Sequence, residues 1–144
     1  MIATARPRTI IWFERVMSAA LLLGILNTIL LWNRLVSGLP SYWGPPTAFQ
    51  AILQSCIFGL YMLLIWMISR RGSSIAKWTF VVVTTAAVLL AFWIPPPSLK
   101  HSIITAVIAV AEYLLALTGI ELVFRPGSRP WFDGRRNLDS KIFS

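Results

Sequence analysis

The chain has 144 residues, of which 57% are hydrophobic and only 12% are charged. Soluble domains carry about 25% charged residues, so this composition excludes an ordinary water-soluble domain and favours a membrane protein. The formal net charge is +8, which in a soluble protein would favour nucleic-acid binding. Here the basic residues lie between apolar stretches. The predicted partners are therefore the lipid bilayer and its anionic headgroups at the cytoplasmic face, with no nucleic acid.

Four apolar stretches follow one another along the chain. They run over approximately residues 12–32, 48–68, 78–94 and 103–124. A helix needs about 20 residues to cross the hydrocarbon core, and the third stretch, with about 17, is the shortest. Polar backbone groups must be paired in lipid, and the stretches lack a two-residue alternation, so helices are predicted rather than strands. We expect an all-α, polytopic four-transmembrane-helix bundle with a basic N-terminus (1–11) and a basic tail (125–144).

Lysines and arginines are distributed unevenly between the two ends of these stretches. Eleven of the 13 lie at the end that holds both termini and the second loop, whereas Arg34 and Lys100 lie at the opposite end. Positive charge is retained on the cytoplasmic side of a membrane. The pattern therefore predicts cytoplasmic termini (N-in/C-in). Because the lysines and arginines are so unequally divided between the two ends, it also argues against dual topology.

Glu112 lies near the centre of the fourth stretch. A charged side chain at that depth costs roughly 2.5–3.5 kcal/mol on insertion scales, so we expect Glu112 to be protonated or to face a donor inside the bundle. At 100° per residue, His101, Thr105 and Gly119 share its helix face. His101 alone also fits an ordinary interfacial residue.

Other polar side chains lie within the remaining stretches. Asn27 and Gln54 fall in the outer halves of the first two, and Thr84 and Thr85 near the middle of the third. These side chains could converge on Glu112 as a buried network. The predicted intramembrane polar site comprises Glu112, Thr105, His101, Asn27 and Gln54. It is interpreted either as a proton or ligand site, or as polar contacts that hold helices together.

Small residues recur at every fourth position in the first two stretches. They are Ala20, Gly24 and Thr28 in the first, and Ala51, Ser55 and Gly59 in the second. Such spacing permits close approach of two helix backbones. It fits packing within the chain and dimerisation equally well.

Charged residues near the stretch ends suggest local ion pairs. Glu121 precedes Arg125 by four residues, which is the favourable order on a helix. Glu14 is adjacent to Arg15, and we expect a similar boundary pair there or a contact with the tail.

The tail combines arginines, a Pro-Gly turn and aromatic residues. Arg125 and Arg129 could contact lipid phosphates while Trp131 and Phe132 enter the membrane interface. The alternatives are a simple stop after the last helix and a docking element for a cytosolic partner.

Reactive groups are scarce in this sequence. Cys56 is the one cysteine and His101 the one histidine, which excludes an intramolecular disulfide and makes a histidine-based metal site improbable. No Ser-His-Asp set, HExxH motif or phosphate-binding glycine loop is present. We therefore expect no enzymatic activity, no metal and no cofactor.

Two segments carry a family resemblance. The first comprises Arg6-Pro-Arg8, Phe13-Glu14 and Leu23-Gly-Ile-Leu-Asn-Thr28, and the second is Phe124-Arg-Pro-Gly-Ser-Arg-Pro-Trp-Phe132. In these segments and in its four-span plan, the chain resembles small four-helix proteins of the bacterial inner membrane. The resemblance implies that location and no particular activity.

Two hypotheses for function remain. In the first, the protein acts by helix-helix interaction, as a self-associating protein or as an accessory subunit of a larger membrane complex. In the second, an oligomer serves as a proton- or cation-coupled transporter or channel that uses Glu112. An oligomer is required because four helices are too few to enclose much of a pathway.

Overall fold

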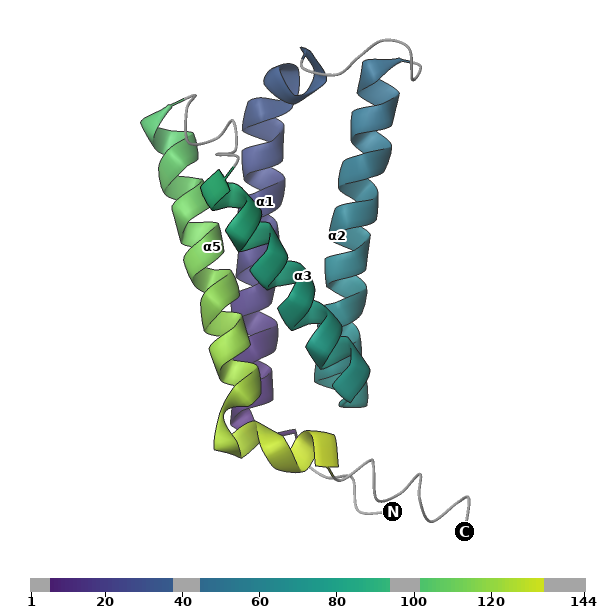
Figure 1. Ribbon diagram of the computed structural model, residues 1–144, viewed down its shortest axis with the longest axis vertical. Coiled ribbons are helices and arrows are strands. Elements are labelled where there is room, and N and C mark those ends of the chain that lie inside the picture. Colours follow the sequence, from purple (N-terminus) through teal and green to yellow (C-terminus); the bar gives the residue numbers. More distant parts are fainter. Residues whose placement is uncertain (1–5, 38–44, 94–101, 134–144) are drawn as a thin grey trace.

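The computed structural model describes residues 6–37, 45–93 and 102–133, and these form helices joined by short connections. The helices are α1 (Arg8–Ser37), α2 (Pro46–Arg71), α3 (Ser74–Trp93) and α5 (Ile103–Phe124), followed by the short turn η2 (Pro126–Ser128) and a helical segment over residues 129–133 (Figure 1). All four long helices are long and apolar enough to cross a membrane. The chain is therefore a small, multi-pass, all-α membrane protein.

The helices extend beyond several of the predicted apolar stretches. α1 has 30 residues and includes Arg34 in its last turn. α3 has 20 residues because the polar segment before Trp78 forms its first turn, and its candidate membrane span covers Ser74–Ala91. Residues 38–44 of the predicted first loop, residues 94–101 around the predicted third loop, including Lys100, and the tail cations Arg135, Arg136 and Lys141 lie outside the described residues.

Gly72 makes the tight connection between α2 and α3. Its φ of 58° lies in the left-handed region, which glycine adopts without steric cost. Its N–H donates to the carbonyl of Ile68, which ends α2, and α3 begins two residues later at Ser74. A side chain at residue 72 would also collide with the carbonyl of Trp131, so the tail lies directly over this turn.

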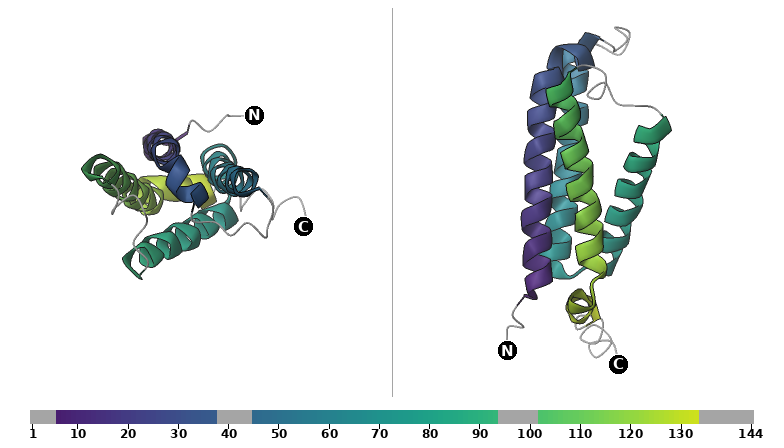
Figure 2. Two further views of the ribbon diagram at one scale, coloured as in Figure 1. Left: turned by 90° about the horizontal axis from the view of Figure 1, so that it is seen from above. Right: turned by 90° about the vertical axis from the view of Figure 1, so that its left-hand side faces the viewer.

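α1 and α5 form the most extensive helix pair, as Figures 1 and 2 show. Two glycines permit this contact. A Cβ atom at Gly119 of α5 would overlap the sulfur of Met17, and one at Gly24 of α1 would lie 2.9 Å from the Glu112 carboxyl. The small residues of α1 therefore serve packing within the chain, whereas the predicted small-residue face of α2 is exposed at Ala51, Ser55 and Gly59.

The hydrophobic core occupies the half of the bundle that contains the start of α1 and the tail. Phe80 packs edge-to-face against two other rings. Its ring centroid lies 5.5 Å from that of Phe13 and 6.3 Å from that of Tyr61. The buried members of the core are Ile10, Phe13, Met17, Ala20, Leu64, Ile65, Ile68, Ala76, Phe80, Leu122, Val123 and Phe132. We call this half the packed end.

The opposite half, the open end, is packed less closely. In α2 no residue from 51 to 63 is buried, and in α3 none from 85 to 91 is buried. The upper part of α3 leans away from the other helices (Figure 2, right). The buried residues of α3 are instead Ala76, Phe80 and Thr84, spaced four apart on one face of its first half. The bundle therefore opens toward the end opposite the termini.

Candidate functional site

A polar cluster around Glu14 joins α1 to α2 at the packed end. The Glu14 carboxylate accepts hydrogen bonds from Ser69 Oγ at 2.7 Å and from Arg6 at 2.9 Å, and it lies 3.5 Å from Arg70. Its ion-pair partners thus come from the N-terminal segment and from α2. Among the described residues Glu14 pairs with neither Arg15, Arg125 nor Arg129, because the fold brings the end of α2 against the start of α1.

The tail folds back onto the packed end. Trp131 Nε1 donates to the carbonyl of Ile68 at 2.9 Å, and Ser128 Oγ donates to Leu122 O at 2.7 Å and forms a second hydrogen bond with the Thr9 hydroxyl at 2.9 Å. Phe132 is only 4% exposed and belongs to the core. We expected Phe132 to enter the membrane interface. In the structure its ring is covered by the chain itself, so that expectation is wrong for this residue.

The two tail arginines remain exposed. Arg125 donates to Glu121 Oε1 at 2.7 Å, which confirms the predicted pair four residues apart. Arg129 directly follows η2 and is also exposed. Lipid contact by these arginines stays a prediction.

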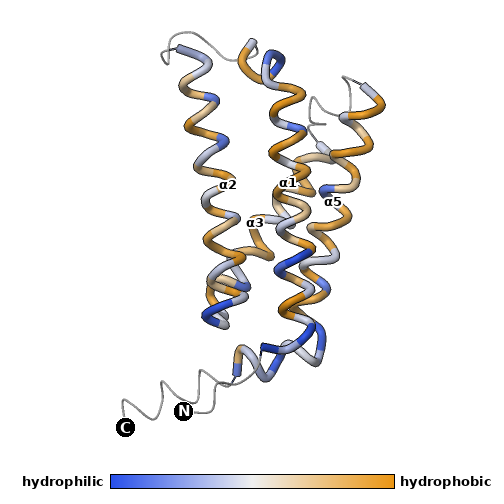
Figure 3. The backbone as a smooth tube through the Cα atoms, turned by 180° about the vertical axis from the view of Figure 1, so that it is seen from behind, coloured by the Kyte–Doolittle hydropathy of each residue, from blue (hydrophilic) through white to orange (hydrophobic). Residues whose placement is uncertain are grey.

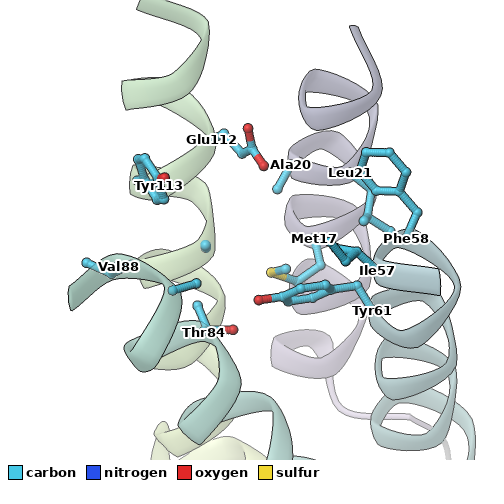
Figure 4. A pocket seen from close by; sticks show the side chains of 12 residues that line it. Met17, Ala20, Leu21, Ile57, Phe58, Tyr61, Thr84, Val88, Glu112 and Tyr113 are labelled. Carbon is cyan, nitrogen blue, oxygen red and sulfur yellow. The ribbon is translucent and has the colours of Figure 1, made fainter. Parts of the chain in front are cut away.

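A cavity of about 200 Å³ lies between the four long helices (Figure 4). Each helix contributes three residues, and no basic residue is among them. The lining consists of Met17, Ala20, Leu21, Ile57, Phe58, Tyr61, Thr84, Ala87, Val88, Glu112, Tyr113 and Ala116. The cavity lies between the hydrophobic core around Phe80 and the open end of the bundle.

Glu112 supplies the one carboxyl group of this lining. Its side chain extends from α5 toward α1 (Figure 4) and lies over Gly24. Within the described part of the chain, the carboxyl has neither a hydrogen-bond donor nor an ion-pair partner. Of the two expectations for Glu112, protonation or a donor inside the bundle, the described side chains supply no donor.

Thr84 and Tyr61 bring hydroxyl groups to the same cavity. Thr84 is 2% exposed, and among the described residues its Oγ1 has no hydrogen-bond partner. Burying a hydroxyl without a partner costs about 1–3 kcal/mol by mutational measurements. Among the described residues, the lining thus combines an unpaired carboxyl with an unpaired buried hydroxyl in a space otherwise formed by apolar side chains and two tyrosines.

The other predicted members of the polar site do not line this cavity. Asn27 is buried with its Oδ1 unpaired among the described residues, and Gln54 is half-buried on α2. Thr105 is buried but forms a capping box with Ser102 at the start of α5. His101 lies outside the described residues.

Sequence reasoning missed the aromatic part of the lining, namely Phe58, Tyr61 and Tyr113. Two signals were available. Tyr113 follows Glu112 directly, and Tyr61 lies well inside the second apolar stretch, away from the interface where tyrosine is usually enriched. Among the described residues no group of three potential metal ligands comes together.

Comparisons with protein-family models, with curated proteins and with solved structures found no match for this chain. The resemblance to small four-helix inner-membrane proteins therefore stays a prediction. The four long apolar helices support the broader description of a small polytopic membrane protein.

Proposed function

We propose that the chain is a bacterial inner-membrane protein with both termini in the cytoplasm. The charge at the two ends of the bundle supports this orientation. The packed end carries Arg6, Arg8, Arg15, Arg70, Arg71, Lys77, Arg125 and Arg129, whereas Arg34 lies at the other end of α1 (Figure 3). Since positive charge is retained inside, the packed end faces the cytoplasm and the open end faces outward.

Cysteine labelling tests this orientation. In a Cys56→Ala background, Ser37→Cys and Ser74→Cys each place one thiol at an exposed position, at opposite ends of the bundle. A membrane-impermeant maleimide added to spheroplasts should label residue 37 and leave residue 74 unlabelled until the membrane is permeabilised. The reverse result, or equal labelling of both, would refute the proposed orientation.

We propose further that the protein acts by helix-helix association, as a self-associating protein or as a subunit of a larger membrane complex. The observation that carries this proposal is the exposed small-residue face of α2. Ala51, Ser55 and Gly59 are exposed, and a Cβ added at Gly59 would find no atom within 4 Å. In lipid, helices associate through close backbone packing at such residues.

Self-association can be measured by energy transfer between labelled copies in liposomes at decreasing protein density. A Gly59→Ile variant should associate about 5- to 30-fold more weakly, the range expected from losing roughly 1–2 kcal/mol of helix contact. Ala86→Ile, at an exposed alanine of α3, is the matched control and should behave as the wild type. If the wild type shows no energy transfer at any protein density, self-association is excluded.

A second candidate function is proton- or cation-coupled transport by an oligomer. The unpaired Glu112 carboxyl in a cavity between all four helices favours it. The test compares wild type and Glu112→Gln for proton-coupled flux in reconstituted vesicles. Flux that the wild type supports and the variant lacks would sustain this candidate, and flux equal to that of empty vesicles in both would end it.

A further inference from the structure

We infer that the cavity between the four helices binds a small organic cation that carries an apolar or aromatic group, such as a quaternary or protonated amine. The inference deepens the second candidate function, because it names the ligand class of the Glu112 cavity. It requires binding only, and does not require that the ligand be moved across the membrane.

The charge of the lining selects a cation. Glu112 contributes a carboxyl, and no lysine, arginine or histidine lines the cavity to attract an anion. A carboxyl in apolar surroundings is neutralised either by a proton or by a cation. A bound ammonium group therefore takes the place of the proton on Glu112, and that proton passes to the aqueous phase.

The remaining lining selects an organic cation over a hydrated metal ion. Hard metal ions need about six to eight oxygen ligands, or several retained waters. Beyond Glu112 this cavity offers mainly methyl groups and rings. The rings of Phe58, Tyr61 and Tyr113 suit an ammonium group, which is attracted to aromatic faces.

Thr84 provides an independent sign that the cavity receives a polar group. Its hydroxyl is almost fully buried, lines the cavity and has no partner among the described residues. Figure 4 shows Thr84 and the Tyr61 hydroxyl on the same side of the space, below Glu112. The N–H of a protonated amine placed there would donate to the Thr84 oxygen, whereas a quaternary ammonium group, which has no N–H, would need a water beside it for this contact.

The size of the cavity limits the ligand. An engineered apolar cavity of about 150 Å³ holds one benzene molecule. The present cavity is larger, at about 200 Å³, and it is open on the side of Ile57 and Ala87, which are exposed, so a cationic arm can extend beyond the ring. A single ring with a short cationic arm is therefore of suitable size.

The ligand can reach this cavity from the bilayer. An apolar groove on the surface between α1 and α2 is lined in part by Leu21 and Phe58, and both residues also line the cavity. These two side chains form a common wall of the groove and the cavity, and a change of their rotamers would connect the two spaces.

The test uses benzyltrimethylammonium as the probe. The full chain is placed in nanodiscs of zwitterionic lipid, which avoids adsorption of the cation to anionic headgroups, and binding is measured by equilibrium dialysis of the radiolabelled cation. We expect saturable binding of one probe per chain. Glu112→Gln should weaken it at least tenfold, whereas Glu121→Gln, on the same helix but in an exposed ion pair, should leave it unchanged.

Two further arms keep the test decisive. Neopentylbenzene has the same shape as the probe but no charge. It should not displace the probe, because it cannot form an ion pair with Glu112. Ala116→Leu fills the cavity and should also weaken binding, with unchanged helicity as the check on folding. Wild-type binding no greater than that of empty nanodiscs, equal binding by Glu112→Gln, or full displacement by neopentylbenzene would each overturn the inference.

The outcomes also separate this inference from transport. Binding without flux would retain the cation site and end the transport candidate. Proton flux without probe binding would retain transport and overturn the cation site.

Discussion

The carboxyl of Glu112 lies against the backbone of Gly24, so closely that a Cβ atom at residue 24 would come 2.9 Å from Glu112 Oε1 and 3.3 Å from the ring of Phe58. Gly24 therefore does more than permit α1 and α5 to approach each other. It leaves the space in which the only carboxyl of the cavity lining sits.

Gly24→Ala should displace that carboxyl. The added methyl group meets the end of a flexible side chain, which can move, so the free energy of unfolding should change little. The position of Glu112 should change, and benzyltrimethylammonium affinity should fall by about 1 kcal/mol, or roughly fivefold. Dialysis of the variant measures this. Gly59→Ala is the control, because no atom lies within 4 Å of the new methyl group, and affinity lowered equally by both changes would contradict the explanation.

Gly119→Ala should destabilise the bundle. Here the new methyl group overlaps the buried sulfur of Met17, and forcing a buried side chain to shift in this way costs about 1–3 kcal/mol. Unfolding by SDS titration, followed by circular dichroism, measures the loss. Combining Gly119→Ala with Met17→Ala should destabilise less than the two separate losses added together, because each change relieves the other. Strict additivity would show that residues 17 and 119 are not in contact.

Glu14→Gln should weaken the contact between α1 and α2. The variant replaces the charged acceptor of Ser69 and Arg6 by a neutral one. The free energy of unfolding should fall by about 1–2 kcal/mol, a value kept low because Glu14 is partly exposed to solvent. Glu121→Gln breaks an exposed pair and should cost only about 0.3–0.5 kcal/mol. Both values come from SDS titration at low and high salt. A Glu14→Gln loss no larger than that of Glu121→Gln would contradict a role for the cluster in joining the helices.

Trp131→Phe should loosen the tail from the packed end. The ring is kept but its hydrogen bond to the carbonyl of Ile68 is lost, which costs about 1 kcal/mol. Amide hydrogen exchange over residues 126–133 should become about fivefold faster, provided that the tail opens locally. Trp93→Phe changes a tryptophan that is 86% exposed and should leave this exchange unaltered. Unchanged exchange in Trp131→Phe would mean that the hydrogen bond does not hold the tail.

Several features follow from the sequence because they depend on short-range properties of the chain. Four helices follow from the length and hydropathy of the apolar stretches, since polar backbone groups in lipid must be paired within the segment. The Glu121–Arg125 pair follows from a spacing of four on a single helix. The depth of Glu112 follows from its distance to the two ends of its stretch.

Only the tertiary structure decides which helix faces meet. These membrane helices are apolar on nearly all sides, so no polar face indicates how each one is turned. Their rotation and tilt result from side-chain packing, which puts Gly24 opposite Glu112, brings Thr84 and Tyr61 into one cavity, and leaves Asn27 and Gln54 outside it. The contact between Trp131 and Ile68 joins residues 63 positions apart, a separation that no helical periodicity can relate.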